Sequence, residues 1–186
     1  YNVSVIVGAS AFIHQLLRSA HSLKHIKKVI IGGCFLEKQL ISKLKTALSE
    51  DAAIEIIYGS TEAEPVSYLN IEELHSQWEL YAKKGYCVGK PVKDVQTRII
   101  PFKKGPLSTK DIIPLSQGEI GELLVSGKHV NDQYFPLEPA FSNNKVLDEK
   151  GILWHRMGDG AYLDKYGHVW LVGRYKHLPE IVLQNF

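Results

Sequence analysis

The sequence predicts an α/β fold in which a parallel-sheet α/β subdomain is followed by a smaller, antiparallel and barrel-like β subdomain. Over residues 1–62, three short β-branched runs alternate with two amphipathic helical patterns. After Gly85 the helical period gives way to short alternating runs separated by glycine-containing turns. We therefore expect an α/β subdomain over residues 1–84 and a β-rich subdomain over residues 85–174.

The first part of the chain repeats one strand-to-helix pattern. "NVSVIV", "KVII" and "IEII" have the composition of buried strands, and "AFIHQLLRSAH" and "LEKQLISKLKTAL" place their apolar residues on one helical face. Alternating strands and helices predict parallel strands with right-handed crossovers. The loops that follow such strands meet at the carboxyl edge of the sheet, where ligands bind in open α/β folds. This edge would bring together "GAS" (8–10), "GGC" (32–34) and "YGSTE" (58–62).

The second part of the chain has the pattern of an antiparallel β structure. A helix or helical loop over residues 70–85 precedes it. Strands are expected in "VQTRIIPF", in "GEIGELLVSG" between its glycines, and in the short "LWH". "AYLDKYGHVWLVGR" (161–174) predicts a hairpin with "DKYG" as its turn. Trp78, Trp154 and Trp170 are expected to be packing residues.

Composition excludes several classes of protein. The chain has 186 residues, of which 45% are hydrophobic and 23% charged, as is typical of a globular protein. The near balance of 22 basic and 20 acidic residues gives no electrostatic case for nucleic-acid binding, which usually requires a clustered basic face. Cys34 and Cys87 are far apart and have no metal-binding spacing, and the absence of a disulfide framework favours a reducing, cytoplasmic compartment. No apolar run approaches the roughly 20 residues of a transmembrane segment. Because it begins at Tyr1 without Met, we expect part of a larger chain.

Two stretches combine residue types that suit a nucleotide. In "YGSTE", Tyr58 offers a flat ring for a base, Thr61 a hydroxyl for a phosphate, and Glu62 a carboxylate for a metal. In "GDG", Asp159 could accept hydrogen bonds from both hydroxyls of a ribose, and Arg174 could add donors. Taken alone, each stretch is more typical of a turn than of a binding site.

Taken together, five blocks of this sequence resemble the adenylate-forming (AMP-binding) enzymes. The blocks are "IIGGC", "YGSTEAE", "VGKPVKDVQTRI", "GEIGELLVSGKHVNDQYF" and "HRMGDGAYLDKYGHVWLVGR", which follow in the family's order between residues 28 and 176. That family includes acyl-CoA synthetases, acyl-AMP ligases, luciferases and peptide-synthetase adenylation domains. "GSTEAEP" and "HRMGD" resemble a fatty-acyl branch that includes the olefin β-lactone synthetases.

The resemblance implies a role for each matching residue. Tyr58 would stack on adenine with Gly33 and Cys34 against the other face, and Thr61 would hydrogen-bond the α-phosphate. Thr61 and Glu62 are the implied catalytic residues, and Glu62 the implied Mg²⁺ ligand. The implied ATP/AMP-binding residues are Gly33, Cys34, Tyr58, Gly59, Thr61, Asp159 and Arg174. Lys176 falls at the family's hinge, which makes residues 175–186 the hinge and the start of a C-terminal domain.

The implied activity is ATP-dependent activation of a carboxylic acid, with a fatty acid as substrate and coenzyme A as the acyl acceptor. Two departures from the family pattern are Met157, where "RTGD" is usual, and Phe35, where proline is usual. The family's phosphate loop and its catalytic lysine are not in this sequence, so we expect the segment alone to be inactive. The alternatives are a non-catalytic nucleotide-binding or scaffolding remnant and a β-lactone synthetase-like member of the same family.

Overall fold

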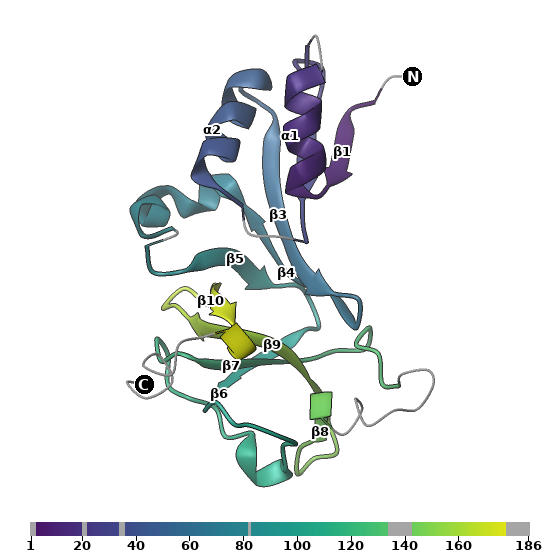
Figure 1. The fold of residues 1–186 in the computed structure, drawn as a ribbon, viewed down its shortest axis with the longest axis vertical. Coiled ribbons are helices and arrows are strands. Elements are labelled where there is room, and N and C mark those ends of the chain that lie inside the picture. Colours follow the sequence, from purple (N-terminus) through teal and green to yellow (C-terminus); the bar gives the residue numbers. More distant parts are fainter. Residues whose placement is uncertain (1–2, 20–21, 34–35, 82, 134–142, 178–186) are drawn as a thin grey trace.

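The computed structural model describes residues 3–19, 22–33, 36–81, 83–133 and 143–177. Its first part is a layer of three parallel strands with two helices that contact each other (Figure 1). In chain order the elements are β1 (Val5–Gly8), α1 (Ser10–Ser19), β2 (Lys28–Ile31), α2 (Lys38–Ala47) and β3 (Ala53–Ser60). The predicted parallel strand-helix alternation is therefore confirmed.

The glycine loops after β1 and β2 lie together beside the middle of β3. Gly8 pairs with Ile31, and Ile31 pairs with Ile56, so β1 and β2 end at the same level of the sheet while β3 continues to Ser60. The backbone N–H of Gly32 donates to the Gly8 carbonyl. A Cβ at Gly32 would lie 2.8 Å from the side chain of Ile57, so only glycine fits this approach.

"YGSTE" is not the strand-to-helix loop that the pattern predicted. β3 continues beyond its pairing with β2 as far as Ser60, and a tight turn at Thr61 and Glu62 leads into the antiparallel strand β4 (Ala63–Asn70). Strand β4 is only weakly indicated by the residue pattern, because Pro65 interrupts a segment with weak alternation. The consequence is that Tyr58 lies on an extended strand that projects past the parallel layer.

The remaining strands are antiparallel, as predicted. They are β5 (Tyr86–Pro91), β6 (Gln96–Ile100), β7 (Gly121–Ser126), β8 (Lys145–Leu147), β9 (Leu153–Leu163) and β10 (Val169–Arg174). Within the described residues all strands form one sheet in the order β1-β2-β3-β4-β5-β10-β9-β7-β6, with β8 paired to β9. β5 pairs with both β4 and β10, so it joins the parallel layer to the β9–β10 hairpin.

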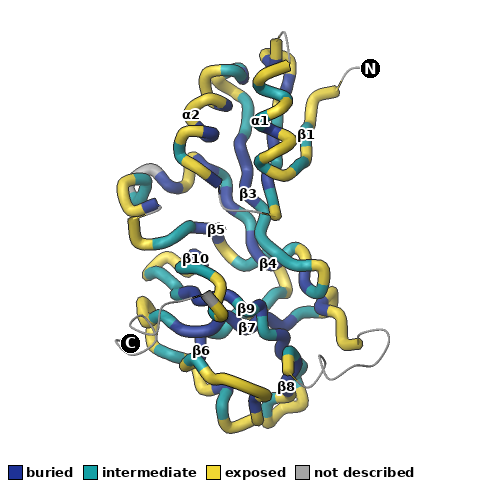
Figure 2. Tube along the Cα trace, viewed as in Figure 1, coloured by how far each residue is buried: buried dark blue, intermediate teal, exposed yellow. Residues whose placement is uncertain are grey.

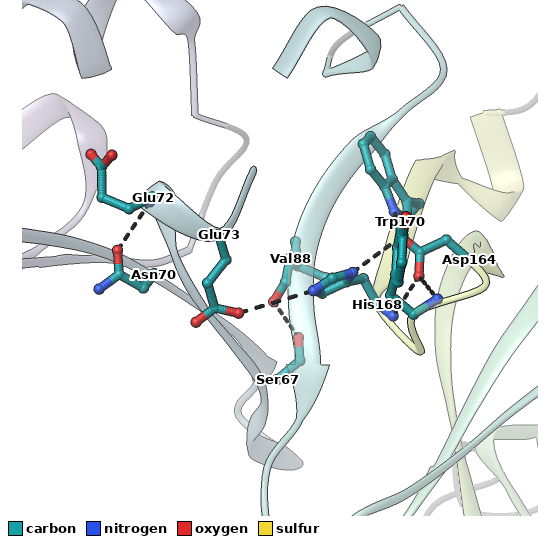
Figure 3. A network of polar contacts seen from close by, with 9 residues as sticks. Ser67, Asn70, Glu72, Glu73, Val88, Asp164, His168 and Trp170 are labelled. Carbon is teal, nitrogen blue, oxygen red and sulfur yellow. Dashed lines mark hydrogen bonds and ion pairs between the residues drawn. The ribbon is translucent and has the colours of Figure 1, made fainter. Parts of the chain in front are cut away.

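A partly buried polar network connects that hairpin to the first part of the chain (Figure 3). Asp164 accepts hydrogen bonds from the backbone N–H of His168 at 2.9 Å and from the indole N–H of Trp170 at 3.0 Å. The imidazole of His168 also lies 4.0 Å from Glu73, in the 3-10 helix Ile71–Leu80. The predicted turn at "DKYG" is confirmed, and the network fixes the strand that ends in Arg174.

Apolar side chains form the core in three clusters, distributed over both parts of the molecule. Trp154 and Trp170 are 1% exposed and confirm the expectation that they are packing residues; Trp78 is half-buried against the same core. The outer strand β1 is different, because Val5 and Val7 are 47% and 67% exposed (Figure 2). None of the helices in the described part of the chain has the length and apolar character that a membrane crossing requires.

Candidate active site

Tyr58, Asp159 and Arg174 lie together, although they are far apart in the sequence. The hydroxyl of Tyr58, near the end of β3, donates a 2.5 Å hydrogen bond to Asp159 Oδ2. The other carboxylate oxygen of Asp159 lies 3.3 Å from Arg174 Nε. Asp159 in β9 and Arg174 in β10 are directly opposite in the strand pairing. The hairpin therefore presents a carboxylate and a guanidinium to the projecting end of β3.

"GDG" is not a turn, because Asp159 lies inside the long strand β9. Gly158 has φ of +70°, a left-handed conformation that favours glycine. The pairing of β9 with β10 is irregular between Leu171 and Gly173, beside the Asp159–Arg174 pair. Such irregularities redirect side chains next to functional sites. The turn interpretation of this stretch is wrong.

The Asp159 carboxyl group and the Tyr58 hydroxyl group influence each other's pKa. Burial raises the pKa of Asp159 above its usual value, while the Tyr58 hydroxyl and Arg174 oppose that rise. Burial, together with the charge and the hydrogen bond of Asp159, raises the pKa of Tyr58 well above its usual value. The tyrosine therefore stays protonated and remains a hydrogen-bond donor.

A cavity of about 250 Å³ opens beside these residues. Gly33 and Gly59, both predicted as nucleotide-binding residues, line it, and so do Tyr58, Asp159 and Arg174. Most of its remaining lining is apolar, which suits a flat base with one polar end. Cys34, also predicted here, lies outside the described residues.

Sequence reasoning missed Tyr81 and Tyr86, two further aromatic residues in this lining. The Tyr86 ring packs edge-on against Tyr81, with the two ring centroids 5.5 Å apart. Its position directly after Gly85, where the period of the sequence changes, was the available signal.

Glu62 lies in a second cavity, of about 440 Å³, which shares Arg174 with the first. Lys176, in the 3-10 helix Tyr175–His177 after β10, also lines it. Partial burial opposes the ionisation of Glu62, but hydrogen bonding within its turn and the nearby Lys145 cation hold the pKa of the carboxyl below its usual value. Glu62 is therefore ionised at neutral pH.

Thr61 is exposed in the β3–β4 turn and lines neither of these two cavities, although its neighbours Ser60 and Glu62 line the second. Among the described residues, no three His, Cys, Asp or Glu side chains gather as a metal-binding group. A single ionised carboxylate beside an open cavity still fits Mg²⁺. This ion is usually held by one or two carboxylates, with waters and substrate phosphates completing its shell.

His155 lines the same cavity as Glu62 and was also missed by sequence reasoning. Its side chain is 4% exposed, and Nδ1 has no hydrogen-bond partner among the described residues. Burial and the nearby Lys145 lower its pKa to about 4, so the imidazole is neutral at neutral pH. A histidine just before "RMGD", in a run that otherwise reads as a buried strand, was the only sequence signal.

Arg156, the first residue of "RMGD", has a structural role. Its guanidinium binds both carboxylate oxygens of Glu122, at 2.8 and 2.7 Å, and donates to the carbonyls of Lys103, Gly105 and Asn143. Met157, which takes the place of a hydroxyl residue, is buried in an apolar cluster.

Comparison with known proteins identifies the family of this chain. The model of the AMP-binding enzyme family matches residues 1–135. The chain belongs to this family. It is 29% identical over 180 residues to an olefin beta-lactone synthetase of Stenotrophomonas maltophilia (strain K279a), a match that covers 94% of this chain and 33% of that protein. It is 33% identical over 152 residues to a putative acyl-CoA ligase of Bacillus subtilis (strain 168), covering 80% of this chain and 25% of the relative.

Solved structures of the AMP-binding family share the fold. O-succinylbenzoate coenzyme A synthetase from Bacillus subtilis, in complex with ATP and magnesium ion, has a TM-score of 0.70 at 22% identity, covering 96% of this chain and 33% of that one. The N-terminal subdomain of NpsA from Klebsiella oxytoca has a TM-score of 0.71 at 23% identity, covering 93% of this chain and 42% of that one. The chain thus spans between a quarter and a third of the length of the two curated relatives given above.

Proposed function

We propose that this chain supplies the nucleotide-binding part of a larger ligase, which activates a carboxylic acid with ATP and releases pyrophosphate. The observation that carries the proposal is the pair of adjoining cavities. Asp159 and Tyr58 line the first, Glu62 lines the second, and Arg174 lines both. A nucleoside in the first cavity would direct its phosphates toward Glu62.

Each of four residues would have a distinct task. The Tyr58 ring would pack on adenine, and Asp159 would accept hydrogen bonds from the ribose hydroxyls, because its carboxylate has acceptor sites beyond those used by Tyr58 and Arg174. Thr61, exposed in its turn, would donate to the α-phosphate. A Mg²⁺ ion held by Glu62 would offset the negative charge of the phosphates.

The chemical step is a displacement at phosphorus. A carboxylate oxygen of the acid forms a bond to the α-phosphorus, and the bond from that phosphorus to the bridging oxygen breaks, so pyrophosphate leaves with the electron pair. The acid is already ionised and needs no general base. The catalytic contributions are therefore orientation of the reactants and electrostatic stabilisation of the phosphoryl group.

We propose a fatty acid as the substrate and the thiol of coenzyme A as the acyl acceptor. Relatives named medium-chain acyl-CoA ligase support this, such as the one from Rattus norvegicus that is 27% identical over 160 residues. Lys176 directly follows the hairpin at the rim of the second cavity. We propose it as the hinge to a C-terminal domain, with a subdomain boundary near residue 85.

A second candidate is formation of a β-lactone. Two olefin beta-lactone synthetases match 94% and 97% of this chain, which favours this candidate. In that reaction the hydroxyl on the β-carbon of the same acid would attack the activated carboxyl carbon and expel AMP, so no thiol would be required.

Acid-dependent exchange of labelled pyrophosphate into ATP tests the first step in the complete protein. A panel of fatty acids and β-hydroxy acids, with and without coenzyme A, distinguishes the acceptors when products are identified by mass spectrometry. An acyl-CoA product supports the ligase, and a β-lactone formed without coenzyme A supports the second candidate. Nucleotide binding without exchange for any acid would favour a non-catalytic remnant. The 186-residue chain alone should bind AMP without catalysing exchange.

A further inference from the structure

Lys145 is a buried cation that none of the proposed catalytic roles uses. Its side chain in β8 is 4% exposed, and burial of a lysine is costly unless its charge is compensated. Its ammonium group donates a short hydrogen bond to the backbone carbonyl of Asn131. The location of Asn131 gives this contact its significance.

Asn131 connects Lys145 to the turn that carries the proposed metal ligand. The backbone N–H of Asn131 donates a 2.8 Å hydrogen bond to the backbone carbonyl of Glu62. Asn131 thus accepts a hydrogen bond from Lys145 through its backbone carbonyl and donates one to the Glu62 carbonyl through its backbone N–H. In the strand pairing, Lys145 is directly opposite His155, whose side chain lines the Glu62 cavity.

The charges around Lys145 fit this arrangement. Burial lowers the pKa of Lys145, and the nearby carboxylates of Glu62 and Asp132 oppose that shift. The β3–β4 turn itself has only two residues between the paired Ser60 and Ala63, so a shift of the Glu62 carbonyl would move the Glu62 side chain as well.

We propose that Lys145 is a positioning residue. It fixes the Thr61–Glu62 turn through the backbone of Asn131 and thereby sets the position at which Glu62 would bind Mg²⁺ near the phosphates. This inference rests on the proposed function for the role of Glu62, but the Lys145–Asn131–Glu62 relay itself is a property of the fold. Residues that orient a metal ligand typically change metal affinity or activity by about 10- to 100-fold when they are replaced.

The relay can be tested on the 186-residue chain without any activity. K145M keeps the length and the apolar stem of the side chain but removes the ammonium group. Hydrogen exchange of the Asn131 amide, followed by NMR, should accelerate by about tenfold, because that amide loses the support that holds it against Glu62. K145R, which retains a cationic donor, should restore most of the protection.

Lys24, which is exposed, provides a control for the loss of a lysine–carbonyl contact elsewhere in the fold. Its ammonium group donates to the backbone carbonyls of Thr46 and Leu48, at 3.0 and 2.6 Å, in the helical part of the molecule. K24M therefore removes a comparable lysine–carbonyl contact and should leave the Asn131 amide unchanged. An Asn131 amide that exchanges equally in K145M and in the wild type would overturn the relay.

The functional consequence is measured in the complete protein as pyrophosphate exchange across a Mg²⁺ titration. K145M should raise the Mg²⁺ concentration for half-maximal rate by about tenfold or more while AMP affinity stays within about twofold, a split that general destabilisation would not produce. A wild type without exchange would refute the proposed function and leave the amide test to judge the relay. If the wild type is active and K145M has the same Mg²⁺ dependence, the positioning role is refuted.

Discussion

Replacing Asp159 by alanine is the sharpest test of the nucleoside cavity. The carboxylate is 4% exposed and is held by Tyr58 on one oxygen and Arg174 on the other. This arrangement fixes its orientation toward the cavity before any ligand arrives. The substitution removes both acceptors for the ribose hydroxyls and leaves the backbone of β9 in place.

The expected loss follows from the two hydrogen bonds at stake. A hydrogen bond to a charged group contributes about 1.5–3 kcal/mol, so two contribute at least about 3 kcal/mol. Since about 1.4 kcal/mol corresponds to a factor of ten, AMP affinity should fall by at least about 100-fold. In the complete protein, kcat/KM for ATP should fall by a similar factor, with a raised KM.

Isothermal titration of AMP into the chain, with thermal unfolding as the control for folding, measures this effect. D159N adds a check on the sign of the pKa shift. Because burial raises the pKa of Asp159, the protonated carboxyl group is favoured in the folded state. The stability gained from that protonation is present at low pH and is lost as pH rises through the raised pKa, so the ionised carboxylate reduces stability at neutral pH. D159N should therefore bind AMP more weakly without a lower melting temperature.

The same reasoning predicts that AMP binding weakens as pH falls through the raised pKa of Asp159, since only the carboxylate can accept from both ribose hydroxyls. D164N is the matched control, because Asp164 is another carboxylate of the β9–β10 hairpin, where it bonds His168 and Trp170 outside this cavity. Folded D159A with unchanged AMP affinity would refute the ribose assignment.

Three further predictions concern other residues. E62Q should keep the fold and AMP binding but shift the Mg²⁺ dependence of pyrophosphate exchange to higher concentrations, because the amide keeps the shape and loses the charge; an unshifted Mg²⁺ titration would remove Glu62 from the metal site. R156M should lower the free energy of unfolding by about 3–5 kcal/mol in denaturant titrations, since it leaves the buried Glu122 carboxylate unpaired; a loss below about 1 kcal/mol would show that the pair is dispensable. Cys87 is fully buried and its pKa is raised to about 12, chiefly by burial, so in a C34A variant a thiol reagent should find no reactive thiol at pH 8 until the chain is denatured. The stability that comes from keeping this thiol neutral should decline only as pH rises above about 9.

The sequence alone determined the parallel strands and the hairpin at Asp164. These features have local causes. β-branched runs, helical periodicity and turn residues depend on residues that are close in the sequence, so they can be recognised without knowledge of the tertiary structure. The sequence also predicted as nucleotide-binding residues five that line one cavity, namely Gly33, Tyr58, Gly59, Asp159 and Arg174. The family was indicated by the resemblance of five motif blocks in their order along the chain, among them "YGSTE" and "GDG", and the family model matches residues 1–135.

Only the tertiary structure decided which of these residues meet and what holds them. β4 was missed, and so the exposed turn position of Thr61 was missed as well, because the pairing of β4 with β3 and β5 depends on strands contributed from elsewhere in the chain. Tyr58 reaches Asp159 across 101 positions of sequence, a contact that no local pattern encodes. Lys145 in the sequence is an ordinary charged residue. Its burial opposite His155 and its contact with the Asn131 carbonyl arise from the packing of three separate segments, and that packing alone makes it part of the site.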